Sequence, residues 1–209
     1  MKKRQETEFL ILVILILFIN VGCSSRAPIN TQPGDIIFQT SQSSQSLAIQ
    51  LATHSKYSHM GIIFLLNGQS YVCEASNVVK FTPLAEWIHR GEDGHYIIKR
   101  LRDAEKLLTP DKITTVEKIA YEYKDIPYDL YFEWSDKRIY CSELVWKIYK
   151  RSMNIEIGKL TYLKDFDLKS DIVQKKLKER FGDKIPYNEF VISPQAMFES
   201  DLLVTVGKK

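Results

Sequence analysis

The sequence has only three cysteines in 209 residues, and no two of them form a Cys-x-x-Cys pair. A disulfide-stapled scaffold and a structural zinc site are therefore both disfavoured. The net charge of +3 is small, and no basic stripe with interleaved aromatic residues is present, so no nucleic-acid partner is expected. The chain also lacks a glycine-rich phosphate loop, internal repeats and low-complexity segments. The sequence therefore indicates neither nucleotide binding through such a loop nor a repeat architecture.

The sequence is long and apolar enough for one well-packed domain, with 44% hydrophobic and 26% charged residues. Its longest apolar run, from Phe9 to Ile19, is shorter than the about 20 residues that a membrane-spanning helix needs. Three basic residues precede this run, as in a secretory signal peptide. We therefore predict a signal peptide over 1–22, a polar tether over 23–32 and a single folded domain over 33–209.

The apolar run ends at Gly22-Cys23, and two serines follow. This pattern resembles a bacterial lipoprotein signal, in which Cys23 becomes the lipid-carrying first residue of the mature chain. Asn20 departs from the aliphatic residue that such signals usually carry, so an uncleaved signal anchor and an ordinary signal peptide remain alternatives. In each case the domain is expected outside the cytoplasm. We predict a membrane-anchored lipoprotein of the bacterial envelope.

The chain is organised around a helix that begins at Cys141. Leu144, Val145, Ile148 and Tyr149 recur at helical spacing and predict one buried face. The N-terminus of a helix presents unpaired N–H groups and a partial positive charge, and both favour the nucleophilic thiolate of a cysteine at that position. Cys141 is therefore a candidate nucleophile. The alternative is a small buried residue that packs the start of the helix.

A base for this thiol is expected on a β-hairpin. Of the four histidines, His59 begins an apolar run that predicts a strand over 59–66. Asn67-Gly68 follows, and a second predicted strand covers 69–75. Asn-Gly between two apolar runs is typical of a two-residue type I′ turn. Such a turn pairs Leu66 with Gln69, and counting back places Gly61 opposite Glu74.

The same register defines which side chains share a face of the hairpin. His59, Gly61, Glu74 and Ser76 point the same way, because side chains alternate along a strand. Glu74 is the diagonal neighbour of His59 and within reach of its ring, whereas Ser76 stands directly opposite and is the competing partner. Gly61 is expected to leave room for the carboxylate. Cys73 falls on the other face.

The position of Cys73 leaves Cys141 as the thiol that can meet His59. With Glu74, these residues form the Cys–His–acid constellation of acyl-transfer enzymes. Their order along the chain is His, Glu, Cys, whereas papain-like enzymes run Cys, His, Asn. The order therefore suggests a circularly permuted relative.

Two more helices are predicted from apolar spacing, one ending near His54 and one over 168–181. Their predicted inward residues are Leu47, Ala48, Leu51 and Ala52 in the first helix and Ile172, Val173, Leu177 and Phe181 in the second. The charged run over 175–180 is predicted to be a solvated helix face.

Six short motifs in this order resemble the YiiX/YebB-like group of permuted papain-fold enzymes of the NlpC type. They are Pro33-Gly34-Asp35-Ile36-Ile37-Phe38, Ser58-His59-Met60-Gly61-Ile62, Val72-Cys73-Glu74-Ala75, Ile126-Pro127-Tyr128-Asp129, Tyr140-Cys141-Ser142-Glu143-Leu144-Val145 and Ile192-Ser193-Pro194-Gln195. The resemblance extends from about Pro33 to the C-terminus. It assigns the nucleophile to Cys141, the base to His59 and the acid to Glu74.

The resemblance implies an α+β, circularly permuted papain-like fold, in which a small antiparallel sheet packs on the helix that bears Cys141. It implies a cell-envelope cysteine hydrolase that cleaves an amide or ester bond in a cell-wall peptide or an N-acyl, lipid-linked substrate. Tyr128 is expected near the cleft, where its hydroxyl could assist an oxyanion or orient the substrate. The alternatives are a catalytically silent, ligand-binding lipoprotein and an acyltransferase of the lecithin:retinol acyltransferase type. No metal or organic cofactor is expected.

Overall fold

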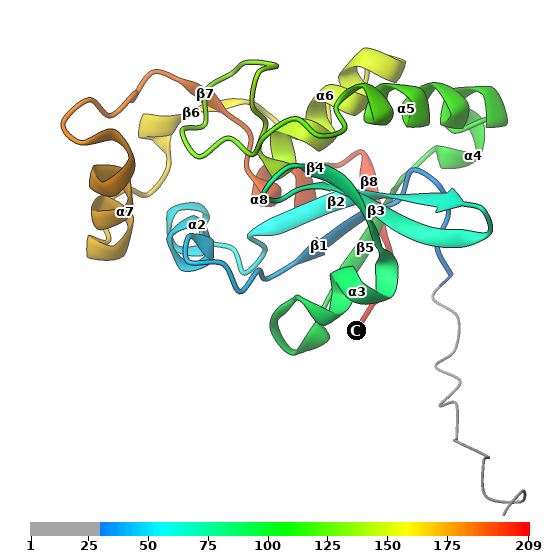
Figure 1. Ribbon diagram of the computed structural model, residues 1–209, viewed down its shortest axis with the longest axis horizontal. Helices are drawn as coiled ribbons and strands as arrows, with labels where there is room; N and C mark the ends of the chain where they lie inside the picture. Colours follow the sequence, from blue (N-terminus) through cyan, green and yellow to red (C-terminus); the bar gives the residue numbers. More distant parts are fainter. Residues whose placement is uncertain (1–29) are drawn as a thin grey trace, which may run out of the picture. The chain divides into compact units, whose positions relative to one another are not determined.

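The computed structural model describes residues 30–209, so the predicted signal peptide and Cys23 lie outside the described residues. The described chain has an α+β fold built on a six-stranded antiparallel sheet (Figure 1). The strand order is β4-β3-β2-β1-β5-β8, and a separate two-stranded sheet pairs β6 with β7. The strands are β1 (Ile36–Gln39), β2 (His59–Leu66), β3 (Gln69–Ala75), β4 (Val79–Pro83), β5 (Ile97–Leu101), β6 (Thr161–Tyr162), β7 (Phe190–Val191) and β8 (Leu203–Lys208).

The helices surround this sheet. They are α2 (Ser46–Thr53), α3 (Leu84–His89), α4 (Ala104–Leu107), α5 (Pro110–Glu122), α6 (Cys141–Met153), α7 (Asp171–Phe181) and α8 (Pro194–Phe198), with short 3-10 turns η1 (Glu92–Gly94) and η2 (Leu163–Asp165). None of the helices within residues 30–209 is long and apolar enough to cross a membrane.

The β2–β3 hairpin has the predicted register. Leu66 pairs with Gln69, and the pairing continues without a shift to Ile62 and Cys73. Asn67 and Gly68 both have positive φ, as a type I′ turn requires. The face assignment of every side chain on β2 therefore follows from the turn.

Helix α6 forms the centre of the main core. Every residue from Cys141 to Tyr149 is buried, because α6 packs both on the sheet, at β2 and β3, and on α5. Figure 1 shows α5 and α6 next to each other above the sheet. The inward side chains of β2, such as Met60, Ile62 and Phe64, belong to the same apolar cluster as Leu144 and Ile148. This packing fixes the start of α6 relative to the strand that begins at His59.

The opposite face of the sheet carries α3. Its Trp87 is fully buried, beside the side chains of β2 and β3 that point away from α6. His59 and Glu74 lie on this face. His59, the first residue of β2, therefore stands between the layer of α3 and the layer of α6.

Helices α2 and α7 pack against each other beside the sheet (Figure 1). Both helices were predicted, but two of the inward assignments are wrong. Leu47 is 51% exposed and Ile172 is 45% exposed. Each helix buries a narrower stripe than the sequence pattern suggests, because α7 contacts mainly α2 and does not pack on the large sheet.

Candidate active site

Cys141 is the first residue of α6 and is 3% exposed. Two buried hydrogen bonds fix the start of this helix to the segment after β7. The Ser142 hydroxyl donates to the Ile192 carbonyl at 2.8 Å, and the Ile192 N–H donates to the Tyr140 hydroxyl at 3.1 Å. Because both neighbours of Cys141 are held in this way, the thiol has a defined position.

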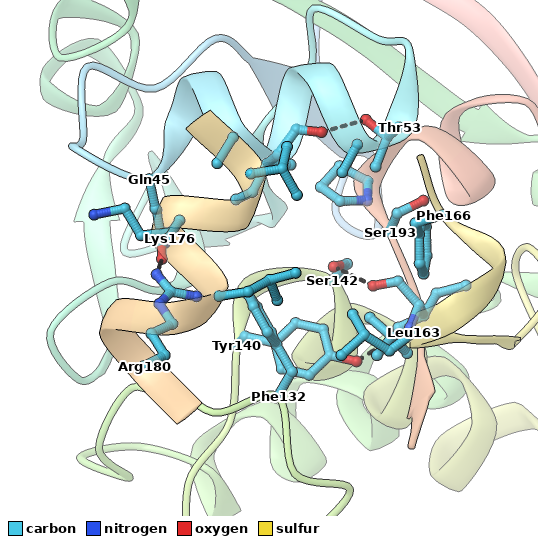
Figure 2. Close-up of a pocket in the computed structure, with 18 of the residues that line it drawn as sticks. Gln45, Thr53, Phe132, Tyr140, Ser142, Leu163, Phe166, Lys176, Arg180 and Ser193 are labelled. Carbon is cyan, nitrogen blue, oxygen red and sulfur yellow. Dashed lines mark hydrogen bonds between the residues drawn. The ribbon is translucent and has the colours of Figure 1, made fainter. Parts of the chain in front are cut away.

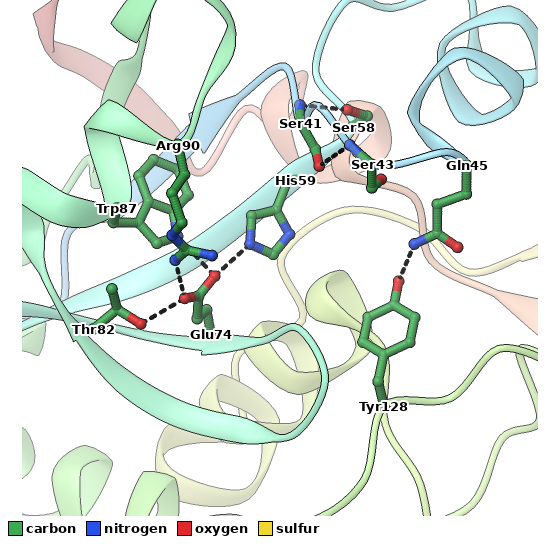
Figure 3. Close-up of polar contacts among 10 residues, drawn as sticks. All are labelled: Ser41, Ser43, Gln45, Ser58, His59, Glu74, Thr82, Trp87, Arg90 and Tyr128. Carbon is green, nitrogen blue, oxygen red and sulfur yellow. Dashed lines mark hydrogen bonds and ion pairs between the residues drawn. The ribbon is translucent and has the colours of Figure 1, made fainter.

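His59 connects the thiol with a carboxylate. Its Nε2 lies 2.6 Å from Oε2 of Glu74 (Figure 3). The Cys141 side chain is near enough to the imidazole to contribute to the raised pKa of His59. Since Glu74 occupies Nε2, Nδ1 is the nitrogen left for the sulfur. The three residues that the hairpin register and the helix pattern selected therefore lie together.

Glu74 is fully buried and accepts hydrogen bonds from four groups. Besides His59, these are the Thr82 hydroxyl at 2.6 Å, the Trp87 indole N–H at 3.1 Å and the Arg90 guanidinium (Figure 3). The Trp87 ring also stacks on the imidazole, with 5.7 Å between ring centroids. Helix α3 and the residue after it thus fix both the carboxylate and the ring of His59.

These contacts shift both pKa values in the direction of an ion pair. Burial alone would lower the pKa of His59, but its contacts with Cys141 and Glu74 outweigh burial and raise it to about 9. Burial alone would raise the pKa of Glu74, but His59, Thr82 and Arg90 hold it at about 2. At neutral pH the imidazole is therefore protonated and the carboxylate is charged.

The orienting contact is made by Glu74 and not by its predicted competitor. The backbone N–H of Ser76 donates to the Val78 carbonyl, and within residues 30–209 Ser76 forms no hydrogen bond with His59. The expectation that Gly61 leaves room for the carboxylate stays a prediction. A Cβ on Gly61 would lie 2.4 Å from Cγ1 of Val72 and 2.6 Å from the Cys73 carbonyl. The glycine therefore makes room for strand β3.

Cys73 lies in the core on the opposite face of the hairpin, as the register predicted. It is fully buried, and both Cys73 and Cys141 are free thiols. Burial, together with the nearby charge of Glu74, raises the pKa of the Cys73 thiol far above its ordinary range. Cys73 is therefore unsuited to act as a nucleophile.

Two other histidines lie at the surface, away from this site. His54, at the C-terminus of α2, pairs with Asp167 at 3.2 Å, and Nδ1 of His95 bonds to the Lys209 carbonyl. Within residues 30–209, no group of three or more His, Cys, Asp or Glu side chains could hold a metal ion.

Tyr128 lies near the thiol. Its hydroxyl accepts a hydrogen bond from Nε2 of Gln45 at 2.8 Å (Figure 3). Burial, followed by the charge of Cys141, raises the pKa of Tyr128 far above its ordinary range. The phenol is thus neutral, and it lines the same pocket as Cys141.

Cys141 and Tyr128 line a pocket between α2, α7 and the β6–β7 segment (Figure 2). The pocket is lined mainly by apolar groups, and its few polar side chains include Gln45, Lys176 and Arg180. The apolar lining comprises Ala48, Ile49, Ala52, Phe132, Leu163, Phe166, Leu168, Val173, Leu177, Val191, Ile192 and Pro194.

Several site residues were not singled out from the sequence. Thr82 could have been found by extending the register, because it pairs with Val72 and is diagonal to Glu74. Trp87 and Arg90 are three residues apart, the spacing that places two side chains on one helix face. Gln45 and Arg180 carry no such signal, because they are distant in sequence and meet only through the packing of α7 on α2.

Comparisons with known proteins agree with this geometry. A family model described as "permuted papain-like amidase enzyme, YaeF/YiiX, C92 family" matches residues 30–207. The protein YiiX of Escherichia coli K12 is 47% identical over 198 residues, which cover 95% of this chain and 95% of YiiX. A crystal structure described as the metalloprotein YiiX from Escherichia coli O157:H7 is 49% identical, with a TM-score of 0.82, and the match covers 85% of this chain and 97% of that one.

Proposed function

The chain belongs to the permuted papain-like amidase family and is a cysteine hydrolase, and from this premise we propose that it removes an apolar acyl group from an amide or ester through an acyl-enzyme on Cys141. The observation that carries the choice of substrate is the apolar pocket that contains Cys141 in its wall. A long acyl chain would pack against these walls, whereas the polar groups of a cell-wall peptide would find few partners there apart from Gln45, Lys176 and Arg180.

The first half of the reaction acylates the enzyme. The Cys141 thiolate attacks the substrate carbonyl carbon, a C–S bond forms, and the carbonyl π electrons move to oxygen. Backbone N–H groups at the start of α6 and the Tyr128 hydroxyl are the donors available for this oxyanion. When the tetrahedral intermediate collapses, the bond to the leaving group breaks. The leaving amine or alcohol takes the proton from the His59 imidazolium.

The second half restores the enzyme. His59, now neutral, takes a proton from water as the water oxygen attacks the thioester carbonyl. Collapse of this second intermediate breaks the C–S bond, releases the fatty acid and returns the thiolate beside the imidazolium. Glu74 keeps the imidazole oriented and favours its charged form throughout.

The related crystal structure is described as a metalloprotein. The side chains next to Cys141 can therefore be compared with the usual protein ligands of a metal ion. Cys141 and His59 offer one sulfur and one nitrogen, fewer than the three protein ligands typical of catalytic zinc sites. Because no group of three such side chains within residues 30–209 is arranged to hold a metal ion, the proposed steps use only the side chains described above.

A series of aminocoumarin amides with acetyl, hexanoyl and decanoyl groups tests the proposal. Each methylene buried in the pocket contributes about 0.8 kcal/mol, so kcat/KM should rise roughly 10²-fold from hexanoyl to decanoyl. Ala48→Phe, which places a ring in the pocket, should remove this gain but leave the acetyl amide unaffected, and the acetyl rate reports correct folding. Faster turnover of an alanyl-glutamyl aminocoumarin than of any acyl amide would instead favour a peptide substrate.

A further inference from the structure

A chain of hydrogen bonds runs from α7 to Tyr128. The Arg180 guanidinium donates to Oε1 of Gln45, and Nε2 of Gln45 donates to the Tyr128 hydroxyl at 2.8 Å (Figure 3 shows the second bond). Gln45 and Arg180 both lie on the same rim of the apolar pocket (Figure 2). The residues come from three distant parts of the sequence, so the chain exists only in the folded protein.

The direction of this hydrogen-bond chain is fixed by chemistry. A guanidinium has donors only, so the group of Gln45 that faces Arg180 must be its carbonyl oxygen. The amide NH₂ then faces Tyr128, and because NH₂ cannot accept, the phenol oxygen must accept. The Tyr128 proton cannot take part in this bond and has to point elsewhere. Within residues 30–209, the Tyr128 hydroxyl donates to no protein acceptor.

Tyr128 and Cys141 line the same pocket, so an oxyanion formed at Cys141 is an acceptor within the space that the free proton faces. A negative charge at Cys141 is also one cause of the raised pKa of Tyr128. Burial keeps the phenol protonated, so it is available as a donor at every working pH. A hydroxyl that is already accepting a hydrogen bond is also a better donor, because hydrogen bonds in a row polarise one another.

Arg180 places a positive charge at the end of the hydrogen-bond chain that is farther from Tyr128. It is half-buried, packs over the Phe132 ring at 5.1 Å, and has no carboxylate within ion-pair distance among residues 30–209. Asp129 and Glu179 act on it only as charges at a distance. The charge is therefore not neutralised by a direct partner, and its hydrogen bond is directed through Gln45 towards Tyr128.

We propose that Gln45 and Arg180 are positioning residues that force the Tyr128 hydroxyl to donate towards the oxyanion formed at Cys141. This inference rests on the proposed function, because it assumes acyl transfer to Cys141 and a donor role for Tyr128. It predicts that the direction of one hydrogen bond, and not only its presence, controls turnover.

The variant Gln45→Glu isolates that direction. The carboxylate has the same shape and forms an ion pair with Arg180, so α2 and α7 stay joined and the melting temperature should not fall. The same carboxylate accepts the Tyr128 proton and takes it away from the oxyanion. With the decanoyl aminocoumarin amide, kcat should fall about 10²–10³-fold, the usual cost of losing one oxyanion donor, and KM should change little. Tyr128→Phe should cause the same loss.

The double variant Gln45→Glu/Tyr128→Phe separates proton direction from simple charge repulsion. If direction is the cause, the double variant is as active as Tyr128→Phe alone, because no donor is left to redirect. A further loss in the double variant, or full activity of Gln45→Glu, would overturn the inference. Full activity of Tyr128→Phe would overturn both this inference and the donor role of Tyr128, while Cys141→Ala independently tests the nucleophile.

Gln69→Glu is the matched control for the added charge. Gln69 is exposed at the turn end of the β2–β3 hairpin, opposite the end that carries His59, and its side-chain oxygen accepts from the Tyr71 hydroxyl. A carboxylate keeps that acceptor. This variant should retain full activity, and a loss equal to that of Gln45→Glu would show that any added negative charge slows the enzyme.

Discussion

Replacing Glu74 by glutamine tests whether the charge of this residue, as distinct from its shape, supports His59. The amide has one accepting oxygen where the carboxylate has two. The least costly arrangement places that oxygen towards His59 and Trp87, where Oε2 stands now, and turns the NH₂ towards Thr82, whose hydroxyl can rotate and accept. The hydrogen bond that orients the imidazole then survives, and the bond from Arg90 is lost.

The magnitudes follow from this rearrangement. A lost hydrogen bond between charged groups at a buried carboxylate costs about 1–3 kcal/mol, which lowers the melting temperature of a chain of this size by roughly 2–12 °C. The imidazolium loses its counter-charge while the Arg90 cation remains nearby, so its pKa should fall below about 9. Turnover should decrease by roughly 10–10⁴-fold, the range between a modest orienting effect and a lost ion pair.

The assay measures two quantities on the same Glu74→Gln preparation: the thermal melting of the protein and its turnover of the decanoyl aminocoumarin amide. Thr82→Val is the matched control, because it removes one buried hydrogen bond to Glu74 but leaves the carboxylate charge on His59. It should lose similar stability with a much smaller loss of rate. A folded Glu74→Gln with full activity would refute the reasoning, because His59 would then need no negative charge beside it.

Three other outcomes are expected. Cys73→Ala should destabilise the core by about 1 kcal/mol but keep most of the activity, since Cys73 lies on the other face of the hairpin; complete loss of activity in a folded variant would contradict this. The rate should decline above pH about 9, because His59 then loses the proton that the leaving group needs. The raised pKa of His59 also stabilises the fold: this stabilisation is complete below the ordinary pKa of 6.5 and is lost as the pH rises through about 9. A stability and a rate that both stay constant from neutral pH to well above pH 9 would be inconsistent with the ion pair. Mass spectrometry of the mature protein from a bacterial membrane should find a lipid-modified Cys23 at its N-terminus, and Cys23→Ser should abolish the modification; any other mature N-terminus would end the lipoprotein prediction.

Short-range patterns predicted which three residues lie together at the candidate site. The Asn67-Gly68 turn fixes the register of the hairpin, and strand alternation then places Glu74 near His59. Helical spacing placed Cys141 at the start of α6. Each of these relations spans fewer than about 20 residues and depends on backbone geometry alone.

Long-range packing determined what the sequence could not indicate. The charged run over 175–180 has the composition of a solvated face, yet Arg180 turns towards Gln45 because α7 packs on α2. The apolar pocket arises from the same contact, since α2 and α7 face each other across it. The partners of Glu74 on α3 are likewise set by how that helix lies on the sheet.

The central claim is that Cys141 carries the acyl group during turnover. An acid quench during the first turnovers of p-nitrophenyl decanoate, followed by peptide mapping, measures this directly, because activated esters acylate a thiol faster than water removes the acyl group. The account predicts a decanoyl thioester on the peptide that contains Cys141, absent in His59→Ala and removed by hydroxylamine. Turnover with the acyl group on Cys73, or with no thioester on either cysteine, would contradict it.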